Sequence, residues 1–357
     1  KGIMKMLLDL FKSKKPIGLD IGANSIKMVE LDVTGDSATL RSFGFSQTPP
    51  LSIVGGEIVD APAISTAVGA LSKEIKTNRA NMIVGIWGSA VIVKRISMPP
   101  VESNLLADQV KWEAEQYIPF DLKEISLDYH ILRKTGSKET MDVLLIAAKK
   151  SVVHVFLDIV VGAGFKCDVI DLSSFALANC FTFNYGVHPE PIAILDVGSQ
   201  LTNFVVVANA EVVFCRDIPF GGGNFTQDIM RDMGVNFEEA EGLKISAASN
   251  QQVPQEVMNS LNASIEAFSE EIQNSFEFFR QTAVGSNVSQ LFFTGGTSRM
   301  PGLVEQVAKN AGVPHDIFNP FLRVKFNSSR FSNDYIEQIK PYCGVAMGLA
   351  LRKDGDS

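Results

Sequence analysis

The strongest constraint on the fold is one hairpin pattern that occurs at two distant places in the chain. The stretch GLDIGANSIKMVEL spans Gly18 to Leu31, and a similar stretch, AILDVGSQLTNFVVV, spans Ala193 to Val207. In each, an apolar run ends in Asp-x-Gly and is followed by small polar residues and a second run of β-branched residues. The pattern predicts two strands joined by a tight turn whose backbone N–H groups lie beside a carboxylate. Such a turn can hold phosphate, and its carboxylate can hold hydrated Mg²⁺.

A third motif makes the duplication more specific, because a single Asp-x-Gly hairpin is usually an ordinary turn. Near the C-terminus an apolar strand ends in a double Gly, LFFTGGTSRMPGL (Leu291 to Leu303). The three motifs together resemble the actin, sugar-kinase and chaperone ATPase superfamily. Within it, the segments LFKSKKPIGLDIGANSIKMVEL, DLSSFALANC and CGVAMGLALR are similar to the PilM family, actin-like cytoplasmic proteins of type IV pilus assembly. The resemblance covers nearly the whole chain.

The resemblance implies an α/β fold, a two-lobed actin-like ATPase with a small α+β insert in the first lobe. The 357 residues, 46% of them hydrophobic, are enough for two lobes with large cores. The expected division is a leader (1–15), a first lobe (16–89, completed by 170–191 and 321–357), an insert (90–169), a second lobe (192–229, completed by 286–320) and a helical subdomain (230–285). The insert is predicted to run β-α-β-β-α-β, with a helix from Ser103 to Tyr117 capped by Ser103. The pattern from Phe237 to Ala283 predicts helix throughout.

Charge and cysteine content exclude several classes of function. The net charge of -8 argues against a nucleic-acid partner, since no Lys/Arg cluster could neutralise a run of phosphates. The four cysteines, far apart and without metal spacing, are typical of core thiols in a reducing cytoplasm. No apolar run approaches the roughly 20 residues needed to span a bilayer. We therefore expect a cytoplasmic protein, peripheral to the inner membrane through a partner. The basic leader either contacts anionic lipid or is a solvated terminus.

The duplicated motifs predict an ATP and Mg²⁺ site between the lobes. Asp20 and Asp196 would hold Mg²⁺ through its waters, and the N–H groups of Gly22 to Ser25 and Gly198 to Leu201 would meet phosphate oxygens. The double Gly would let the backbone approach the adenosine. The full set of predicted nucleotide-binding residues is Asp20, Gly22, Ala23, Asn24, Ser25, Lys27, Asp196, Gly198, Ser199, Gln200, Thr202, Gly222, Gly223, Glu241, Lys244, Gly295, Gly296 and Thr297.

Some members of this set depend on the resemblance and have an ordinary structural alternative. Lys27 lies where actin relatives keep a phosphate-binding lysine, but it could be an exposed strand residue. Thr202 matches a recurrent phosphate-turn threonine, or is simply β-branched in a strand. Gly222 and Gly223 are assigned to the cleft by resemblance only. Glu241 and Lys244 would flank the nucleoside, or form an exposed i,i+3 ion pair.

The residues that follow the insert bear on hydrolysis. Hydrolytic actin relatives carry Glu or Gln before a Pro at the start of the helix after the insert, where this chain has Ser173-Ser174-Phe175. A serine orients attacking water poorly, so we expect ATP binding with slow turnover at most. A sugar-kinase-type phosphotransferase and a division-type actin-like filament protein are the alternative functions. The first would need an acidic base beside a small-substrate pocket, and the second a C-terminal amphipathic helix, which the tail lacks.

The predicted helix of the insert supplies the candidate partner site. Its apolar residues cannot all face one way, so some either remain exposed or fill the insert's own core. The resemblance implies a groove that receives the cytoplasmic N-terminal peptide of a PilN-like membrane protein, with further contacts to other pilus platform and motor proteins. The predicted partner-binding residues are Leu106, Val110, Trp112 and Tyr117.

Overall fold

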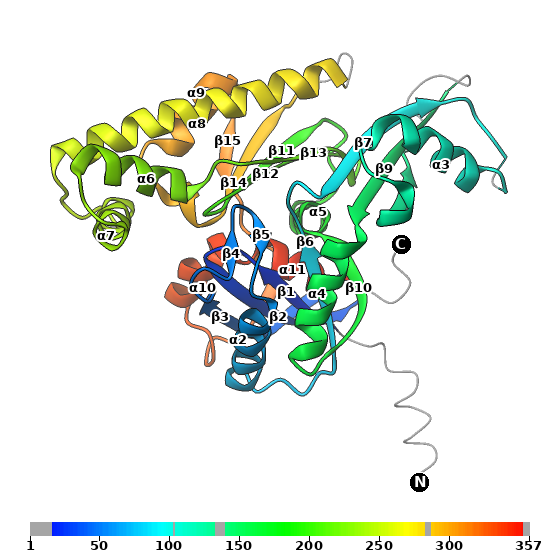
Figure 1. Ribbon diagram of the computed structural model, residues 1–357. Helices are drawn as coiled ribbons and strands as arrows, with labels where there is room; N and C mark the ends of the chain where they lie inside the picture. The colour runs from blue at the N-terminus through cyan, green and yellow to red at the C-terminus, as the bar shows by residue number, and fades with distance from the viewer. Residues whose placement is uncertain (1–15, 103, 133–139, 283–286, 353–357) are drawn as a thin grey trace, which may run out of the picture.

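The computed structural model describes residues 16–102, 104–132, 140–282 and 287–352, which form two lobes and a projecting insert (Figure 1). The predicted leader (1–15) and the Ser103 cap lie outside the described residues. Among the helices that the structure describes, none is both long enough and apolar enough to cross a membrane.

The first lobe is built on a six-stranded sheet whose strand order is β10-β6-β1-β2-β3-β16. Its strands are β1 (Ile17–Ile21), β2 (Ser25–Thr34), β3 (Ser37–Gln47), β6 (Asn81–Ile86), β10 (Lys166–Leu172) and β16 (Val324–Phe326). Its helices are α2 (Ala61–Glu74), α4 (Lys150–Gly162), α5 (Ser173–Tyr185), α10 (Asn333–Ile339) and α11 (Gly344–Ala350). A short hairpin, β4 (Ile53–Val54) and β5 (Glu57–Ile58), lies between β3 and α2.

Alternation along β1 and β2 gives this sheet two buried faces. On one face, Leu19 and Met28 pack with apolar residues of α2 and α4. On the other, Val29 and Leu31 pack with α5 and α11. Helix α11 lies very close to its neighbours: a Cβ added to Gly18 would be 1.9 Å from the Ala346 carbonyl oxygen. The glycines at this contact are therefore required for α11 to reach the sheet.

The second lobe repeats the plan with a five-stranded sheet of order β13-β12-β11-β14-β15. Its strands are β11 (Ile192–Val197), β12 (Thr202–Ala208), β13 (Glu211–Ile218), β14 (Gln290–Thr294) and β15 (His315–Ile317). Its helices are α6 (Gly222–Met233), α7 (Phe237–Ala248), α8 (Gln255–Thr282) and α9 (Leu303–Ala311). One face of this sheet joins the core of the first lobe. There the ring centre of Phe181, in α5, lies 5.1 Å from the ring centre of Phe292, in β14. The two lobes thus share a hydrophobic core through α5.

The sequence pattern predicts one continuous helical segment after α6, but the structure divides this segment into two helices. Helix α7 ends at Ala248 and α8 begins at Gln255. Between them Asn250 has a φ of +56°, and Pro254 immediately precedes the new helix. Asn tolerates the left-handed conformation and, within helices, proline is favoured at the start, so the helix is interrupted here.

The insert is smaller than predicted. It is a three-stranded sheet of order β7-β9-β8 covered by one long helix. Its elements are β7 (Val91–Met98), α3 (Leu106–Tyr117), the short 3₁₀ helix η1 (Leu122–Glu124), β8 (Ile125–Ile131) and β9 (Met141–Lys149). The predicted range 90–169 is wrong at its C-terminal end, because β10 pairs with β6 and the apolar face of α4 packs in the first lobe. Alternation reveals a strand but not the sheet it joins.

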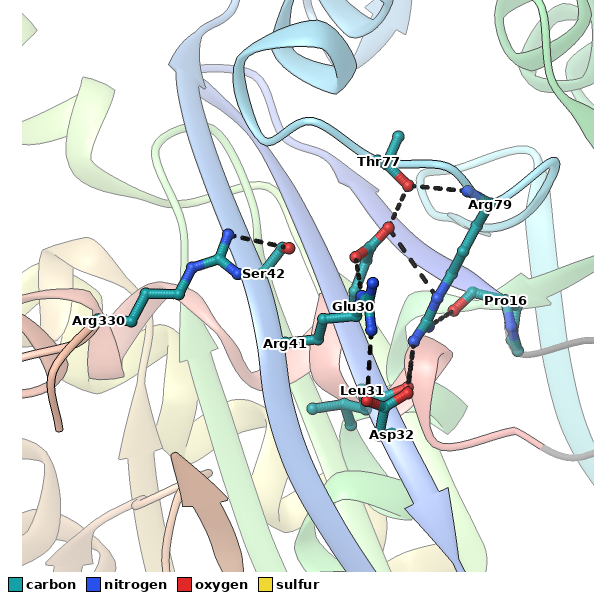
Figure 2. A network of polar contacts seen from close by, with 9 residues as sticks. All are labelled: Pro16, Glu30, Leu31, Asp32, Arg41, Ser42, Thr77, Arg79 and Arg330. Atoms are coloured by element: carbon teal, nitrogen blue, oxygen red, sulfur yellow. Dashed lines mark hydrogen bonds and ion pairs between the residues drawn. The ribbon is translucent and has the colours of Figure 1, made fainter. Parts of the chain in front are cut away.

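A buried polar network holds the first lobe together at the end of the sheet where β1 begins (Figure 2). Glu30 is 1% exposed and accepts a short hydrogen bond from Thr77. Arg79 donates to the carbonyl of Pro16 at 3.0 Å and forms an ion pair with Asp32 at 3.0 Å. Burial lowers the pKa of Arg79, which the nearby carboxylates oppose. The network fixes the start of β1 relative to β2, and hence the first Asp-x-Gly turn.

Candidate functional site: a cleft between two equivalent turns

The two Asp-x-Gly hairpins have the same geometry. In β1–β2, Ile21 pairs with Ile26, and in β11–β12, Val197 pairs with Thr202, so four residues form each turn. The Gly22 N–H donates to the Ser25 carbonyl at 3.0 Å, and the corresponding N–H of Gly198 donates at the same distance. The repeat seen in the sequence is thus a repeat of register as well as of residue type.

Among the described residues, a cavity of about 340 Å³ lies between the lobes at the ends of these turns. Its volume is within the range of small-molecule sites. The cavity is lined by these predicted residues: Asp20, Gly22, Ala23, Asn24, Ser25, Lys27, Asp196, Gly198, Ser199, Gln200, Gly222, Glu241, Lys244, Gly295, Gly296 and Thr297. The structure therefore brings most of the predicted set to one place, from both lobes.

Lys27 is a cleft residue and not an exposed strand lysine. Its side chain is 12% exposed, and its Nζ lies 3.1 Å from Asp20 Oδ2. The cause is the hairpin register, which places Lys27 directly opposite Asp20. The first turn therefore presents a cation and a carboxylate side by side, next to backbone N–H groups.

Asp196, the counterpart of Asp20, lies in a less favourable environment for a charge. The pKa of Asp196 is raised to about 7, mainly by burial and also by the neighbouring Asp20, while Lys27 opposes the shift. The site thus has two carboxylates that repel each other and one nearby ammonium group. A bound cation would relieve this repulsion, so the residues fit Mg²⁺ held through its waters. Among the described residues, no group of three or more His, Cys, Asp or Glu side chains could hold a metal ion by itself.

The second turn is held in place by its neighbours. The Gly222 N–H donates to the Gly198 carbonyl at 2.9 Å, and the Gly223 N–H donates to the Ser199 carbonyl at 2.6 Å. The Thr297 hydroxyl also donates to the Gly198 carbonyl at 2.9 Å. Because these donors occupy the carbonyls on one side of the turn, they fix the orientation of its peptide groups.

Two predicted residues do not line the cavity. Thr202 is fully buried and its hydroxyl donates to the Phe220 carbonyl at 2.7 Å. Successive strand side chains point to opposite faces, so Asn203 and not Thr202 faces the cleft. Gly223 supports the second turn through its N–H, which donates to the Ser199 carbonyl. The structure places the Thr202 side chain away from the cleft, whereas the assignment of Gly223 to ligand contact stays a prediction.

The double Gly forms the third wall. Gly295 has a φ of +87°, and a Cβ there would lie 2.4 Å from the Val197 carbonyl oxygen. A Cβ on Gly296 would lie 2.7 Å from the Tyr342 ring. The left-handed backbone and the close approach both require glycine, which lets β14 end directly against Asp196.

Glu241 and Lys244 form an ion pair in the cleft wall, with Nζ 2.7 Å from Oε2. Lys244 also donates to the Thr226 hydroxyl at 2.8 Å and to the Gly222 carbonyl at 3.0 Å. Burial lowers the pKa of Lys244, and Glu241 opposes the shift. The pair therefore links α7 to the start of α6 beside the second turn.

Several cleft residues were not in the predicted site. They are Trp87, Ser173, Leu201, Asn203, Ile245, Ala248, Ser249, Arg299, Met300, Pro341, Tyr342, Gly344 and Val345. Asn203 could have been found from the repeat, because it aligns with Lys27. Trp87 and Tyr342 carry no local signal, since they reach the cavity only through the packing of distant elements. The Ser173 hydroxyl, at the start of α5, is buried and has no hydrogen-bond partner in the described part of the chain.

The predicted partner-binding residues divide into two pairs. Leu106 is 5% exposed and Val110 is fully buried, because both face the insert's own core; they are not available to a partner, which corrects the prediction. Trp112 is 58% exposed and Tyr117 is 40% exposed. Leu105, which precedes α3, is also exposed. Of the four predicted residues, Trp112 and Tyr117 therefore remain exposed on α3. Leu105 adds to this apolar surface.

Comparison with solved structures shows where this architecture has been seen. The chain is similar to a chain of the structure titled "PilM-PilN type IV pilus biogenesis complex", with a TM-score of 0.84 and 26% identity over 95% of this chain and 98% of that one. It is also similar to the ethanolamine utilization protein EutJ from Carboxydothermus hydrogenoformans, with a TM-score of 0.56 and 15% identity over 94% and 89% of the two chains. The second likeness concerns the fold alone.

The sequence relatives include cell division proteins. The cell division protein FtsA of Bacillus subtilis (strain 168) is 24% identical over 334 residues, which cover 81% of this chain and 74% of FtsA. FtsA of Streptococcus pneumoniae serotype 2 is also 24% identical, over 85% of this chain and 75% of FtsA.

The family assignment rests on a match over nearly the whole chain. The family model described as "Type IV pilus assembly protein PilM" matches residues 18–354, which include both Asp-x-Gly turns, the insert and the double Gly. With the two-lobed actin-like ATPase fold described above, this match shows that the chain belongs to the PilM family of type IV pilus assembly proteins.

Proposed function

We propose that this chain is an ATP-binding, actin-like assembly protein of the type IV pilus inner-membrane platform. On the cytoplasmic side it binds the N-terminal peptide of a PilN-like membrane protein and links the platform to motor components. The observation that carries the nucleotide part is the convergence of two equivalent Asp-x-Gly turns on one cavity. Each turn offers backbone N–H groups, and the carboxylates Asp20 and Asp196 face the same space.

The cleft walls suit the parts of a nucleotide differently. The turns and Lys27 suit phosphate oxygens, because N–H groups and an ammonium group are donors to anions. The bare backbone at Gly295 and Gly296, with Lys244 and Glu241 opposite, suits the sugar and base. Mg²⁺ would supply charge neutralisation between the two carboxylates and the phosphates.

The start of α5 supports slow turnover. Ser173 lines the cavity where a longer Glu or Gln side chain would reach toward attacking water in hydrolytic relatives. A serine hydroxyl is shorter and is a weak base, so nucleotide would serve as a structural or switching ligand. Steady-state turnover above about 1 s⁻¹, the low end for ordinary enzymes, would contradict this.

Mg-ATP should raise the melting temperature of the protein. A ligand at 100 times its dissociation constant adds roughly 2.7 kcal/mol to the free energy of unfolding. Asp20→Ala should lose most of this stabilisation, because it removes one side of the metal site and leaves Lys27 unpaired. Asp36→Ala, in an exposed turn of the same lobe, is the matched control and should respond like the parent. An unchanged response in Asp20→Ala would mean that the nucleotide binds elsewhere.

The partner part of the proposal is supported by the related complex and by the insert. The similar solved structure is titled as a complex of PilM with PilN. On this chain, α3 exposes Trp112 and Tyr117, with Lys94 Nζ 4.3 Å from the centre of the Tyr117 ring. An extended peptide could bind such a surface through a few apolar anchors, with modest affinity because it must become ordered.

Trp112→Ala should weaken capture of this peptide roughly 30-fold, equivalent to about 2 kcal/mol, the loss typical of an aromatic anchor. The measurement is fluorescence anisotropy with a labelled peptide from the cytoplasmic N-terminus of the PilN-like protein in the same genome. Phe237→Ala removes an aromatic ring with similar exposure on α7, 56% against 58%, and should leave peptide affinity within about twofold. Equal affinities for the two variants would place the peptide site away from α3.

A further inference from the structure

A partly buried carboxylate, Asp217, joins the cleft wall to the base of the insert. Asp217, on strand β13, accepts a hydrogen bond from the Gly88 N–H at 2.7 Å and another from the Asn203 side-chain amide at 2.5 Å. Gly88 belongs to the first lobe and lies between β6 and β7. Asn203 belongs to the second lobe and lines the cleft. Asp217 therefore links the second lobe to the first, at the point where the chain leaves the first lobe for the insert.

Strand β13 is well placed for such a connection. It is the edge strand of the second-lobe sheet, and it contacts β7 of the insert (Figure 1). Near its other end, Glu211 lies 3.7 Å from His130 of the insert. Strand β13 thus contacts the insert, and its end near Asp217 leads to the cleft through Asn203.

The two donors to Asp217 lie at the two places that the link would connect, the cleft and the start of the insert. Asn203 is the counterpart of Lys27 in the duplicated hairpin, opposite Asp196, so it faces the region assigned to phosphates. Gly88 has a φ of +103°, a conformation suited to glycine, at the corner where the chain leaves the first lobe for the insert. The preceding residue, Trp87, lines the cleft and donates to the Ile21 carbonyl at 2.7 Å.

The contacts of Asp217 are strengthened because the group is partly buried. Burial raises the pKa of Asp217, and the hydrogen bonds from Gly88 and Asn203 oppose the shift. A buried acceptor that loses a donor keeps its desolvation penalty, so the link favours one discrete arrangement. A ligand in the cleft that accepts a hydrogen bond from the Asn203 amide would compete with Asp217 for that donor.

We propose that Asn203 and Asp217 couple occupancy of the cleft to the position of the insert, so that Mg-ATP alters both the exposure of β7 and the affinity of the insert for its peptide. The inference rests on the proposed nucleotide site and adds its route to the partner site. Linkage requires the effect to be reciprocal: peptide bound to the insert changes the affinity for Mg-ATP by the same factor.

Hydrogen exchange of the full chain with and without Mg-ATP tests the coupling. In the parent, exchange should slow in the two turns (22–25 and 198–201) and change at least twofold in β7. Asp217→Ala should keep the protection of the turns and lose the change in β7. Glu211→Ala, on the same strand and at the same boundary with the insert, is the matched control and should keep both.

A second pair of variants covers the case in which Asp217→Ala does not fold. Asn203→Asp places two carboxylates against each other and should remove the β7 response at saturating Mg-ATP. In the double variant with Asp217→Asn, the new amide at 217 can donate to the new carboxylate at 203, and its oxygen can still accept from the Gly88 N–H. The double variant should therefore regain the β7 response. Saturation is judged from protection of the turns.

The outcomes separate the two proposals. No protection of either turn in the parent would overturn both the nucleotide site and this coupling. Protected turns with an unchanged β7, or a full β7 response in Asp217→Ala, would overturn the coupling alone. Loss of the response in Asn203→Asp without recovery in the double variant would also contradict it.

Discussion

Asp196→Asn should make the ligand-free protein more stable at pH 8 and, at the same time, nearly insensitive to Mg-ATP. The pKa of Asp196 is raised from 3.8 to about 7, so at pH 8 the folded state carries a charge that burial and Asp20 disfavour. A shift of this size corresponds to about 4 kcal/mol at most, and access of water from the cleft reduces it, so we expect a gain of about 2 to 4 kcal/mol. Asparagine keeps the shape and removes the charge.

The pH dependence of this gain has a definite sign. Below about pH 4 Asp196 is protonated in both the folded and the unfolded state, and the substitution changes little. As pH rises, the unfolded chain ionises first, so the parent loses stability until the folded-state pKa near 7 and stays at that level above it. The advantage of Asp196→Asn should therefore grow between about pH 4 and pH 7 and then level off.

Chemical denaturation from pH 4 to pH 8.5, with and without Mg-ATP, measures both effects. Asp36→Asn, in an exposed turn, provides a control in which one carboxylate is neutralised far from the cleft. Mg-ATP should stabilise the parent and the control, and should have little effect on Asp196→Asn. A variant less stable than the parent at pH 8 would mean that Asp196 is held by favourable contacts, and the account of its raised pKa would be wrong.

Gly348→Ala should destabilise the protein by about 3 kcal/mol or more, a large effect for one methyl group. A Cβ at this position in α11 would lie 1.7 Å from the Ala176 carbonyl oxygen and 2.4 Å from its carbonyl carbon. Both are backbone atoms of α5, so no side-chain rotation can relieve the contact. The helices must separate, and α11, which begins at the cleft with Gly344, must move.

Gly242→Ala is the matched control, because it is also an interior helix glycine but has no atom within 4 Å of the added Cβ. There the substitution should stabilise by roughly 0.5 to 1 kcal/mol, since alanine is the better helix former. Urea denaturation of the two variants gives the comparison. Similar free energies of unfolding for both would show that α11 is not held against α5 as closely as described.

The features predictable from sequence are those that depend on neighbours in the chain. The two turns, their identical register and the glycines of the third wall follow from local patterns, and the structure brings them to one cavity. The direction of side chains along a strand was predicted less well. Thr202 and Asn203 are neighbours and point to opposite faces of the sheet, and the sequence pattern did not show which of them faces the cleft. The burial of Val110 depends on how the insert's helix is rotated on its sheet, which periodicity leaves open.

Other features depend on contacts between distant segments and had no local signal. The pattern of α4 and β10 predicts a helix and a strand, but their place in the first lobe depends on pairing with β6. Trp87 and Tyr342 reach the cavity from segments far apart in the chain, and Asp217 acquires the Gly88 N–H as a partner only when both lobes are in place.

The way the first-lobe sheet takes elements from both ends of the chain also determines the order in which the molecule can be completed during translation. The second lobe, from β11 to β15, leaves the ribosome as one uninterrupted stretch. In contrast, β1 to β3 must wait for α11, roughly 300 residues later, which takes about 15 to 60 s at ordinary rates of synthesis. Until then the apolar face that includes Val29, Leu31 and Leu40 lacks α11. We therefore expect the nascent first lobe to expose this apolar face until α11 has been synthesised, which makes it a site for aggregation or chaperone binding during translation.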